Sequence, residues 1–113
     1  MDSFDIIIKI FAMKNIAVVG MSPRQQRPSN YVAMYMEDKG YDIIPVNPSH
    51  QNIQSKKCYP SLLDIPVKVD IVNVFRQSQF APSIAKEAVS IQAKAIWLQD
   101  GVAMKIGMRL FLT

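Results

Sequence analysis

The sequence has little of the side-chain chemistry that builds metal sites and catalytic centres. Its 113 residues include one cysteine, Cys58, and one histidine, His50. A single cysteine cannot form a disulfide within the chain, and a Cys/His zinc site would need more ligands than this composition offers. We therefore expect no bound metal, and we interpret Cys58 as a partly buried thiol in a protein of a reducing compartment.

Long basic runs and apolar runs of membrane-spanning length are also missing. The net charge is +4, but the longest basic run is Lys56-Lys57. This balance weakly favours anionic ligands such as nucleotide phosphates and does not predict nucleic-acid binding. No apolar stretch reaches the roughly 20 residues of a membrane span, and the start of the chain lacks the basic region of a signal peptide. We expect a cytoplasmic protein with no membrane or nucleic-acid partner.

Short apolar runs alternate along the chain with segments of helical spacing. The runs at 16–19, 41–46, 69–75 and 93–99 are rich in Val, Ile and Ala, which is typical of buried parallel strands. This alternation predicts an α/β fold, a Rossmann-like, doubly wound and mainly parallel sheet in a single three-layer domain spanning residues 1–113.

The segments between these runs supply the expected helices. Helical spacing marks residues 4–11 and 29–39, the second capped by Ser29 or Asn30 and ended by Gly40. A third helix follows a cap at Ser78 and carries Pro82 in its first turn, where proline is tolerated. Residues 49–58 are expected to be irregular, and one helical turn is expected from Ser61.

Ligands of doubly wound sheets bind outside the carboxyl ends of the strands. The first of these ends, "IAVVGMSPRQQRPS", fails the dinucleotide fingerprint, because Ser22 and Gln25 stand where the second and third glycines belong. The second strand ends at Asn47 and not at an acidic residue that could bind ribose hydroxyls. The sequence therefore argues against a conventional NAD site, and it contains no P-loop either.

The same loop has features that suit a phosphate. Gly20 permits a tight turn, Ser22 offers a hydroxyl, and the following helix directs its amino-terminal dipole at the same space. Arg24 and Arg27 add charge suited to bidentate phosphate contacts. The alternative is that Gly20 only closes a turn and both arginines are solvated.

Several segments in order carry a family resemblance: "VVGMSPRQQRPSNYVA", "GYDIIPVNP", "CYPSLLDIP", "VDIVNVFR" and "AIWLQDGV". Over residues 5–103 the chain resembles the small stand-alone CoA-binding proteins, which are similar to the CoA-binding domains of succinyl-CoA synthetase alpha subunits and ADP-forming acyl-CoA synthetases. The resemblance implies bound coenzyme A. The site residues that it implies are Gly20, Met21, Ser22, Arg27, Asn47, Pro48, Phe75, Arg76, Ser78, Gln99 and Gly101.

The resemblance also shows where the chain departs from the family. Gln92 replaces the glycine that usually closes the helix before the last clear strand, and the sequence diverges after about residue 103. We expect the final strand of the family to be missing or replaced. The apolar tail at 110–112 and an open sheet edge then predict a homodimer, unless the tail folds back as a strand of its own chain.

Paired catalytic groups are scarce near the expected site. Asp100 is the one acid at the strand ends, and His50 has no Ser or Cys beside it, whereas general acid/base catalysis needs positioned partners. We therefore predict a non-catalytic protein that binds coenzyme A or acyl-CoA. The alternatives are a small NAD(P)-binding oxidoreductase or regulatory nucleotide-binding domain, and an interaction protein with a vestigial pocket.

Overall fold

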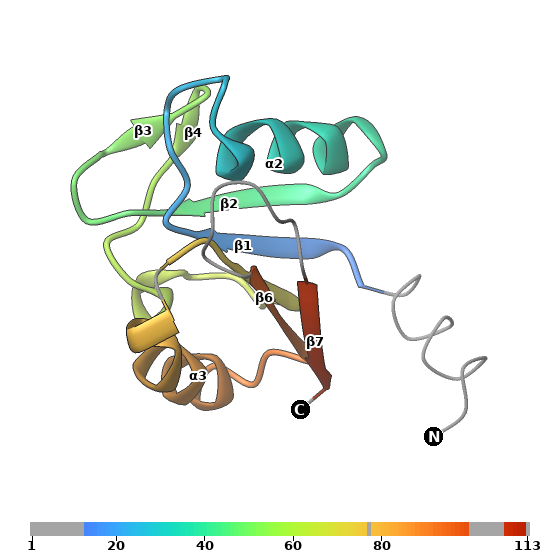
Figure 1. Cartoon of the computed structure of the whole chain (residues 1–113), viewed down its shortest axis with the longest axis vertical. Coiled ribbons are helices and arrows are strands. Elements are labelled where there is room, and N and C mark those ends of the chain that lie inside the picture. Colours follow the sequence, from blue (N-terminus) through green and yellow to red (C-terminus); the bar gives the residue numbers. More distant parts are fainter. Residues whose placement is uncertain (1–12, 77, 100–107, 113) are drawn as a thin grey trace.

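A computed structural model describes residues 13–76, 78–99 and 108–112, which form a five-stranded sheet (Figure 1). The strand order is β2-β1-β5-β6-β7. All neighbours pair in parallel except β6 and β7, which are antiparallel. The mainly parallel sheet predicted from the sequence is therefore confirmed. The strands are β1 (Asn15–Val19), β2 (Asp42–Val46), β5 (Ile71–Val74), β6 (Ala95–Gln99) and β7 (Met108–Leu112).

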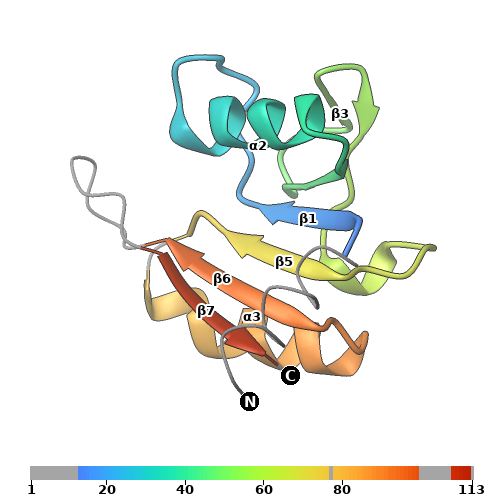
Figure 2. The same ribbon diagram turned by 90° about the vertical axis from the view of Figure 1, so that its right-hand side faces the viewer.

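Helices cover both faces of this sheet (Figures 1 and 2). Helix α2 (Pro28–Asp38) packs on one face and α3 (Ala81–Ser90) on the other. Two 3-10 turns, η1 (Leu62–Asp64) and η2 (Ser78–Phe80), precede β5 and α3. A small hairpin of β3 (Asn52–Ile53) and β4 (Lys56–Lys57) lies outside the main sheet.

Successive residues of β1 divide the core into two layers. Ile16 and Val18 pack in the cluster that contains Ala33 of α2. Ala17 and Val19 pack in the cluster that contains Ile84 of α3. Because side chains alternate across a strand, β1 is buried on both sides, which explains why its residues 16–19 are all apolar. The predicted three-layer, doubly wound arrangement is thus confirmed.

The starts of both helices differ from the sequence-based expectation. The N-cap of α2 is Arg27, and Pro28 is its first residue, a position that suits a proline because its missing N–H needs no partner there. Ser29 and Asn30 are therefore inside the first turn, and the expectation that one of them caps the helix is wrong. The cap expected at Ser78 is also wrong, because η2 intervenes and Phe80 is the N-cap of α3.

The ends of the helices follow the sequence more closely. Gly40 closes α2 with φ +101°, as predicted. Gln92 follows α3 with φ +61°, so this position keeps the left-handed backbone although its side chain is not glycine. Such a conformation costs on the order of 1 kcal/mol in a non-glycine residue.

Residues 49–58 contain more structure than expected. Gln54 and Ser55 both have positive φ and connect β3 to β4 in a tight turn. This turn lacks the Asn-Gly or Asp-Gly pair that normally marks a two-residue hairpin, so it could not be predicted from the sequence. The turn expected from Ser61 is confirmed as η1, whose N-cap is the Ser61 side chain.

The carboxyl-terminal tail folds back onto the sheet. β7 pairs with β6 in a register that sets Leu112 opposite Ala95, which is the alternative that the sequence left open. The expected final strand is therefore replaced by an antiparallel one. The helix expected over residues 4–11 lies outside the described residues. Within the described ranges, no helix has both the length and the apolar character to cross a membrane.

Candidate functional site

The ends of β1, β2 and β5 meet at one edge of the sheet, as the sequence predicted. The Gly20 N–H donates to the Val46 carbonyl at 2.8 Å, and the Phe75 N–H donates to the Val19 carbonyl at 2.8 Å. Of the expected site residues, Gly101 lies outside the described residues. Ser78 and Gln99 are placed only as backbone positions in η2 and β6.

Gly20 is required by the protein's own backbone. Its φ is +82°, and a Cβ atom there would lie 2.7 Å from the Phe75 carbonyl oxygen and 2.9 Å from Cδ of Arg76. Any larger residue would push the ends of β1 and β5 apart. This glycine therefore allows the first loop and Arg76 to lie against each other.

Hydrogen bonds fix the loop between β1 and α2 to the first turn of the helix. The Ser22 N–H donates to Oγ of Ser29 at 2.9 Å, and Nδ2 of Asn30 donates to the Ser22 carbonyl at 2.8 Å. Oγ of Ser22 accepts from the Arg24 N–H at 3.1 Å. That last bond uses the oxygen as an acceptor, so it is compatible with the hydroxyl donating its proton to a ligand.

Arg24 and Arg27 are both exposed but differ in how their backbones are held. Arg27 is the N-cap residue of α2, and its carbonyl accepts from the N–H groups of Asn30 at 2.9 Å and Tyr31 at 3.1 Å. Arg24 lies at the tip of the loop, where its carbonyl accepts from the Arg27 N–H at 3.1 Å. The Arg27 backbone is thus attached to the helix that carries the positive end of the dipole.

Asn47 connects the end of β2 to the first loop. Its Nδ2 donates to the Met21 carbonyl at 3.0 Å, and its Oδ1 accepts from the Ser49 N–H at 2.9 Å. The Met21 side chain is fully buried in the α2-side core, so Met21 could offer a ligand only its backbone. The amide of Asn47 therefore connects the end of β2 to the first loop, at the position where an NAD-binding chain would have an acidic residue.

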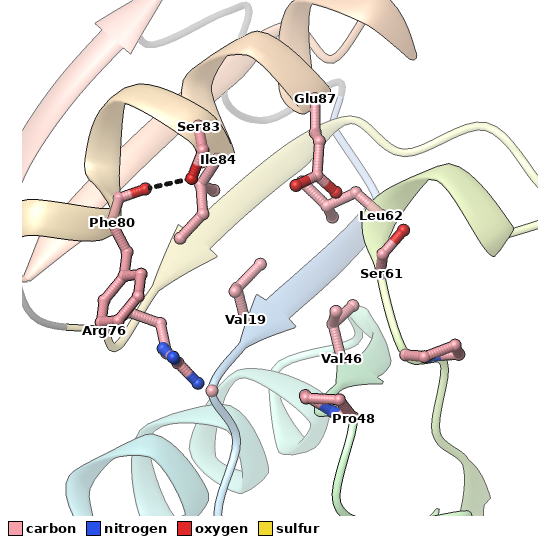
Figure 3. A pocket seen from close by; sticks show the side chains of 12 residues that line it. Val19, Val46, Pro48, Ser61, Leu62, Arg76, Phe80, Ser83, Ile84 and Glu87 are labelled. Atoms are coloured by element: carbon pink, nitrogen blue, oxygen red, sulfur yellow. Dashed lines mark hydrogen bonds between the residues drawn. The ribbon is translucent and has the colours of Figure 1, made fainter.

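An apolar cleft of about 190 Å³ opens beside these strand ends, on the α3 side of the sheet (Figure 3). Val19 and Val46 form its floor, where β1 and β2 end. Of the residues expected from the sequence, Gly20, Pro48 and Arg76 line it. The expectation missed most of the lining, which includes Ser61, Leu62, Phe80, Ser83, Ile84 and Glu87.

Apart from Val19 and Val46, the missed residues come from the segments around η1 and η2 and from α3, and not from strand ends. Ser61 and Leu62 belong to the segment "CYPSLLDIP", which indicated only a turn. Ile84 and Glu87 lie three positions apart on α3, so they share one face of that helix. Their place beside the strand ends depends on how α3 packs, which no local pattern reveals.

The cleft carries one charged group on each side. The guanidinium carbon of Arg76 lies 4.5 Å from the centroid of the Phe80 ring, a cation–π contact that orients the side chain. Glu87 lies on the other side, near Ser61 and Leu62 (Figure 3). Both charged residues are partly buried.

Cys58 directly follows β4 and packs in the α2-side core. It is buried rather than partly buried as expected, in the core cluster that also contains Ile53 of β3. Burial raises the pKa of its thiol, and Sγ donates a hydrogen bond to the Asn47 carbonyl at 3.4 Å. Within the described part of the chain, no three His, Cys, Asp or Glu residues gather as a metal site would require.

Comparison with known proteins identifies the family of this chain. The CoA binding domain family matches residues 14–107. YneT, an uncharacterized protein of Bacillus subtilis, is 45% identical over 89 residues, which are 79% of this chain and 66% of YneT. Acetate–CoA ligase [ADP-forming] II of Archaeoglobus fulgidus is 34% identical over 80 residues, which are 69% of this chain and 12% of that enzyme.

A solved structure has the same fold. A hypothetical protein from Pyrococcus horikoshii superposes with a TM-score of 0.82 at 37% identity, covering 88% of this chain and 70% of that one. The family match includes β1, β2, β5 and β6, whose ends carry the loops described above. The chain belongs to the CoA binding domain family.

Proposed function

We propose that this chain binds coenzyme A or acyl-CoA and catalyses no reaction with it. The observation that carries the proposal is the meeting of the Gly20 loop and Arg76 beside an apolar cleft, in a chain of the CoA binding domain family. A phosphate group and a flat apolar group could bind there side by side.

The loop between β1 and α2 is proposed to bind phosphate. The Ser22 hydroxyl and the Arg27 guanidinium are the side chains suited to it, and the dipole of α2 favours negative charge at the same place. The bonds from Ser29 and Asn30 to Ser22 hold the loop in this shape before a ligand arrives. Such preorganisation reduces the entropy lost on binding.

The cleft is proposed to enclose the adenine end of the ligand. Its volume of about 190 Å³ is below the roughly 300–1,000 Å³ of pockets that bury a whole drug-sized ligand. Coenzyme A is larger still, so only one part of it fits. Pro48 and Ile84, which line the cleft, offer apolar surface for a flat base, and the pantetheine arm would extend away from it.

The residues around the cleft support a binding role over a catalytic one. Among its described lining residues, Glu87 is the one acid, and no histidine or cysteine accompanies it. A general acid/base mechanism needs a second positioned group. We expect background rates in assays with acyl-CoA, and in assays with ATP, a carboxylic acid and CoA. Turnover that is lost in His50→Ala or Glu87→Gln would overturn the non-catalytic role.

Isothermal titration calorimetry with CoA, acetyl-CoA and NAD tests the binding proposal. We expect CoA or acetyl-CoA to bind and NAD to bind more weakly, because Asn47 stands where a carboxylate would hold the NAD ribose. Tighter binding of NAD would favour the alternative of an NAD(P)-binding oxidoreductase or regulatory domain. Native mass spectrometry of protein purified without added ligand would identify whether free CoA or acyl-CoA is retained.

A further inference from the structure

We infer that Glu87 is the residue that selects adenine in the cleft, by accepting a hydrogen bond from the 6-amino group of the base. This inference rests on the proposed function, because it assigns a role within the same site. It concerns a residue on a helix, and not one on the strand-end loops where the expected ligand contacts lie.

The position of Glu87 is set by the packing of α3. Ile84, one turn earlier, is buried against the sheet in the cluster that contains Val19. That contact directs the shared face of α3 towards the cleft, so Glu87 lines it opposite the end of β1 (Figure 3). The carboxylate is therefore placed at the far side of the cleft from Arg76.

The cleft has a definite polarity. On one side of the cleft, Arg76 and Gly20 lie next to the loop that is proposed to bind phosphate. The floor of the cleft is apolar, and its other side carries the Glu87 carboxylate. A matching ligand has an anion at one end, a flat apolar body, and a hydrogen-bond donor at the opposite end. The adenosine phosphate portion of CoA has this order of groups, with the 6-amino group as the donor.

An acyl chain or the pantetheine arm matches the cleft less well. A hydrocarbon chain that filled it would remove water from the Glu87 carboxylate without supplying a hydrogen bond, which is unfavourable. The hydroxyl of Ser61 lines the same part of the cleft and caps η1 by accepting from the Leu63 N–H at 3.1 Å. Both oxygen-bearing side chains thus favour a polar edge, such as that of a purine, over an alkyl end.

The test is a comparison of CoA with its analogue in which unsubstituted purine replaces adenine, titrated into four proteins. The analogue keeps the ring and the phosphates and lacks only the 6-amino donor. We expect the wild type to bind CoA about tenfold more tightly, as a charge-assisted hydrogen bond at a partly exposed site would give. Glu87→Met should weaken CoA about tenfold and leave the analogue unchanged, so that the preference disappears.

Two further variants make the result specific. Glu87→Gln keeps an oxygen that can accept the same bond without its charge, and it should retain a preference of about threefold. Lys86→Met, on the exposed side of α3, is the matched control and should keep the full preference. Circular dichroism and thermal melts check that each variant is folded.

The outcomes separate the two proposals. A wild type that binds CoA and the purine analogue equally well overturns the role of Glu87 and leaves CoA binding intact. The same holds if Glu87→Met weakens both ligands to the same extent, which would indicate a purely structural effect. A wild type that binds neither ligand overturns the proposed function itself.

Discussion

The side-chain amide of Asn47 donates a hydrogen bond to the carbonyl oxygen of Met21 at 3.0 Å. This bond joins the end of β2 to the loop after β1, across 26 residues of sequence. The Oδ1 atom of the same amide accepts from the Ser49 N–H, so both ends of the side chain are used by the protein. Asn47 thereby sets the distance between the two loops on one side of the proposed ligand.

Asn47→Asp should weaken CoA binding several-fold and destabilise the fold by about 1–2 kcal/mol. The substitution keeps the acceptor for Ser49 and replaces the donor to Met21 with an oxygen that repels the carbonyl. It also adds negative charge near the proposed phosphate loop. Calorimetry and urea unfolding measure the two effects. Asn52→Asp, exposed on β3, adds the same charge and should change neither; wild-type CoA affinity in Asn47→Asp would contradict the prediction.

Gly20→Ala should destabilise the protein by more than Gly40→Ala, although both glycines have positive φ. A Cβ at Gly20 would lie 2.7 Å from the Phe75 carbonyl oxygen, whereas a Cβ at Gly40 meets no atom within 4 Å. The left-handed backbone alone costs roughly 1–2 kcal/mol. We expect about that loss for Gly40→Ala and about 3 kcal/mol or more for Gly20→Ala. Equal losses in urea unfolding would show that the ends of β1 and β5 can separate freely.

The meeting of the strand-end loops at one edge of the sheet is the feature that the sequence predicted well. Parallel strands end at one edge, so Gly20, Asn47 and Arg76 could be placed together without knowing any contact. Glu87 could not be found in this way, because its place depends on the packing of Ile84 into the core. An acid on an amphipathic helix usually faces solvent, and nothing local distinguishes this one.

The other differences also have local causes. Ser29 and Asn30 have the composition of helix caps, but Pro28 starts the helix earlier and their side chains bond to Ser22 instead. The β3–β4 hairpin turns at Gln54 and Ser55, whose side chains give no turn signal. The tail at 108–112 was ambiguous because an apolar run of that length suits a strand within the chain or a contact with a partner. The homodimer stays a prediction.

The contacts of the Asp70 carboxylate predict how the free energy of unfolding depends on pH. Its Oδ2 accepts from the N–H groups of Lys14 and Asn15, both at 2.9 Å, and Nζ of Lys94 lies 3.5 Å from Oδ1. Burial raises the pKa of this carboxyl, but the two backbone bonds and the Lys94 charge together hold it below its usual value. The carboxylate therefore contributes stability that is complete above the unfolded-state pKa of about 3.9 and is lost as the pH falls through the lower folded-state pKa.

Asp70→Asn should accordingly destabilise the protein by about 1–3 kcal/mol at pH 7, and the difference from wild type should shrink below about pH 4. Urea unfolding at pH 7, 5, 3 and 2 measures it. Asp42→Asn is the control, since that carboxylate is exposed and 4.0 Å from Lys14, and it should have little effect at any pH. A difference for Asp70→Asn that stays constant down to pH 2 would contradict this account.

Arg27 should contribute more to CoA binding than Arg24. Both side chains are exposed, but Arg27 is the N-cap residue of α2, and its carbonyl accepts from the N–H groups of Asn30 and Tyr31. Arg24 lies at the loop tip, where a mobile charge contributes roughly 0–1 kcal/mol. A held, charge-assisted contact contributes roughly 1.5–3 kcal/mol. Arg27→Ala should therefore weaken CoA about tenfold or more, and Arg24→Ala only about a few-fold.

Titration of both variants with CoA and dephospho-CoA at one salt concentration also identifies which phosphate Arg27 contacts. If it contacts the 3′-phosphate, the loss caused by Arg27→Ala should shrink with dephospho-CoA, because that ligand lacks the group. If it contacts the pyrophosphate, the loss should be the same with both ligands. A larger loss in Arg24→Ala would mean that the ligand approaches the tip of the loop and not the start of α2. Full affinity in both variants would mean that this loop does not bind phosphate, and the cleft beside Arg76 would then be the place to search for the ligand's charge.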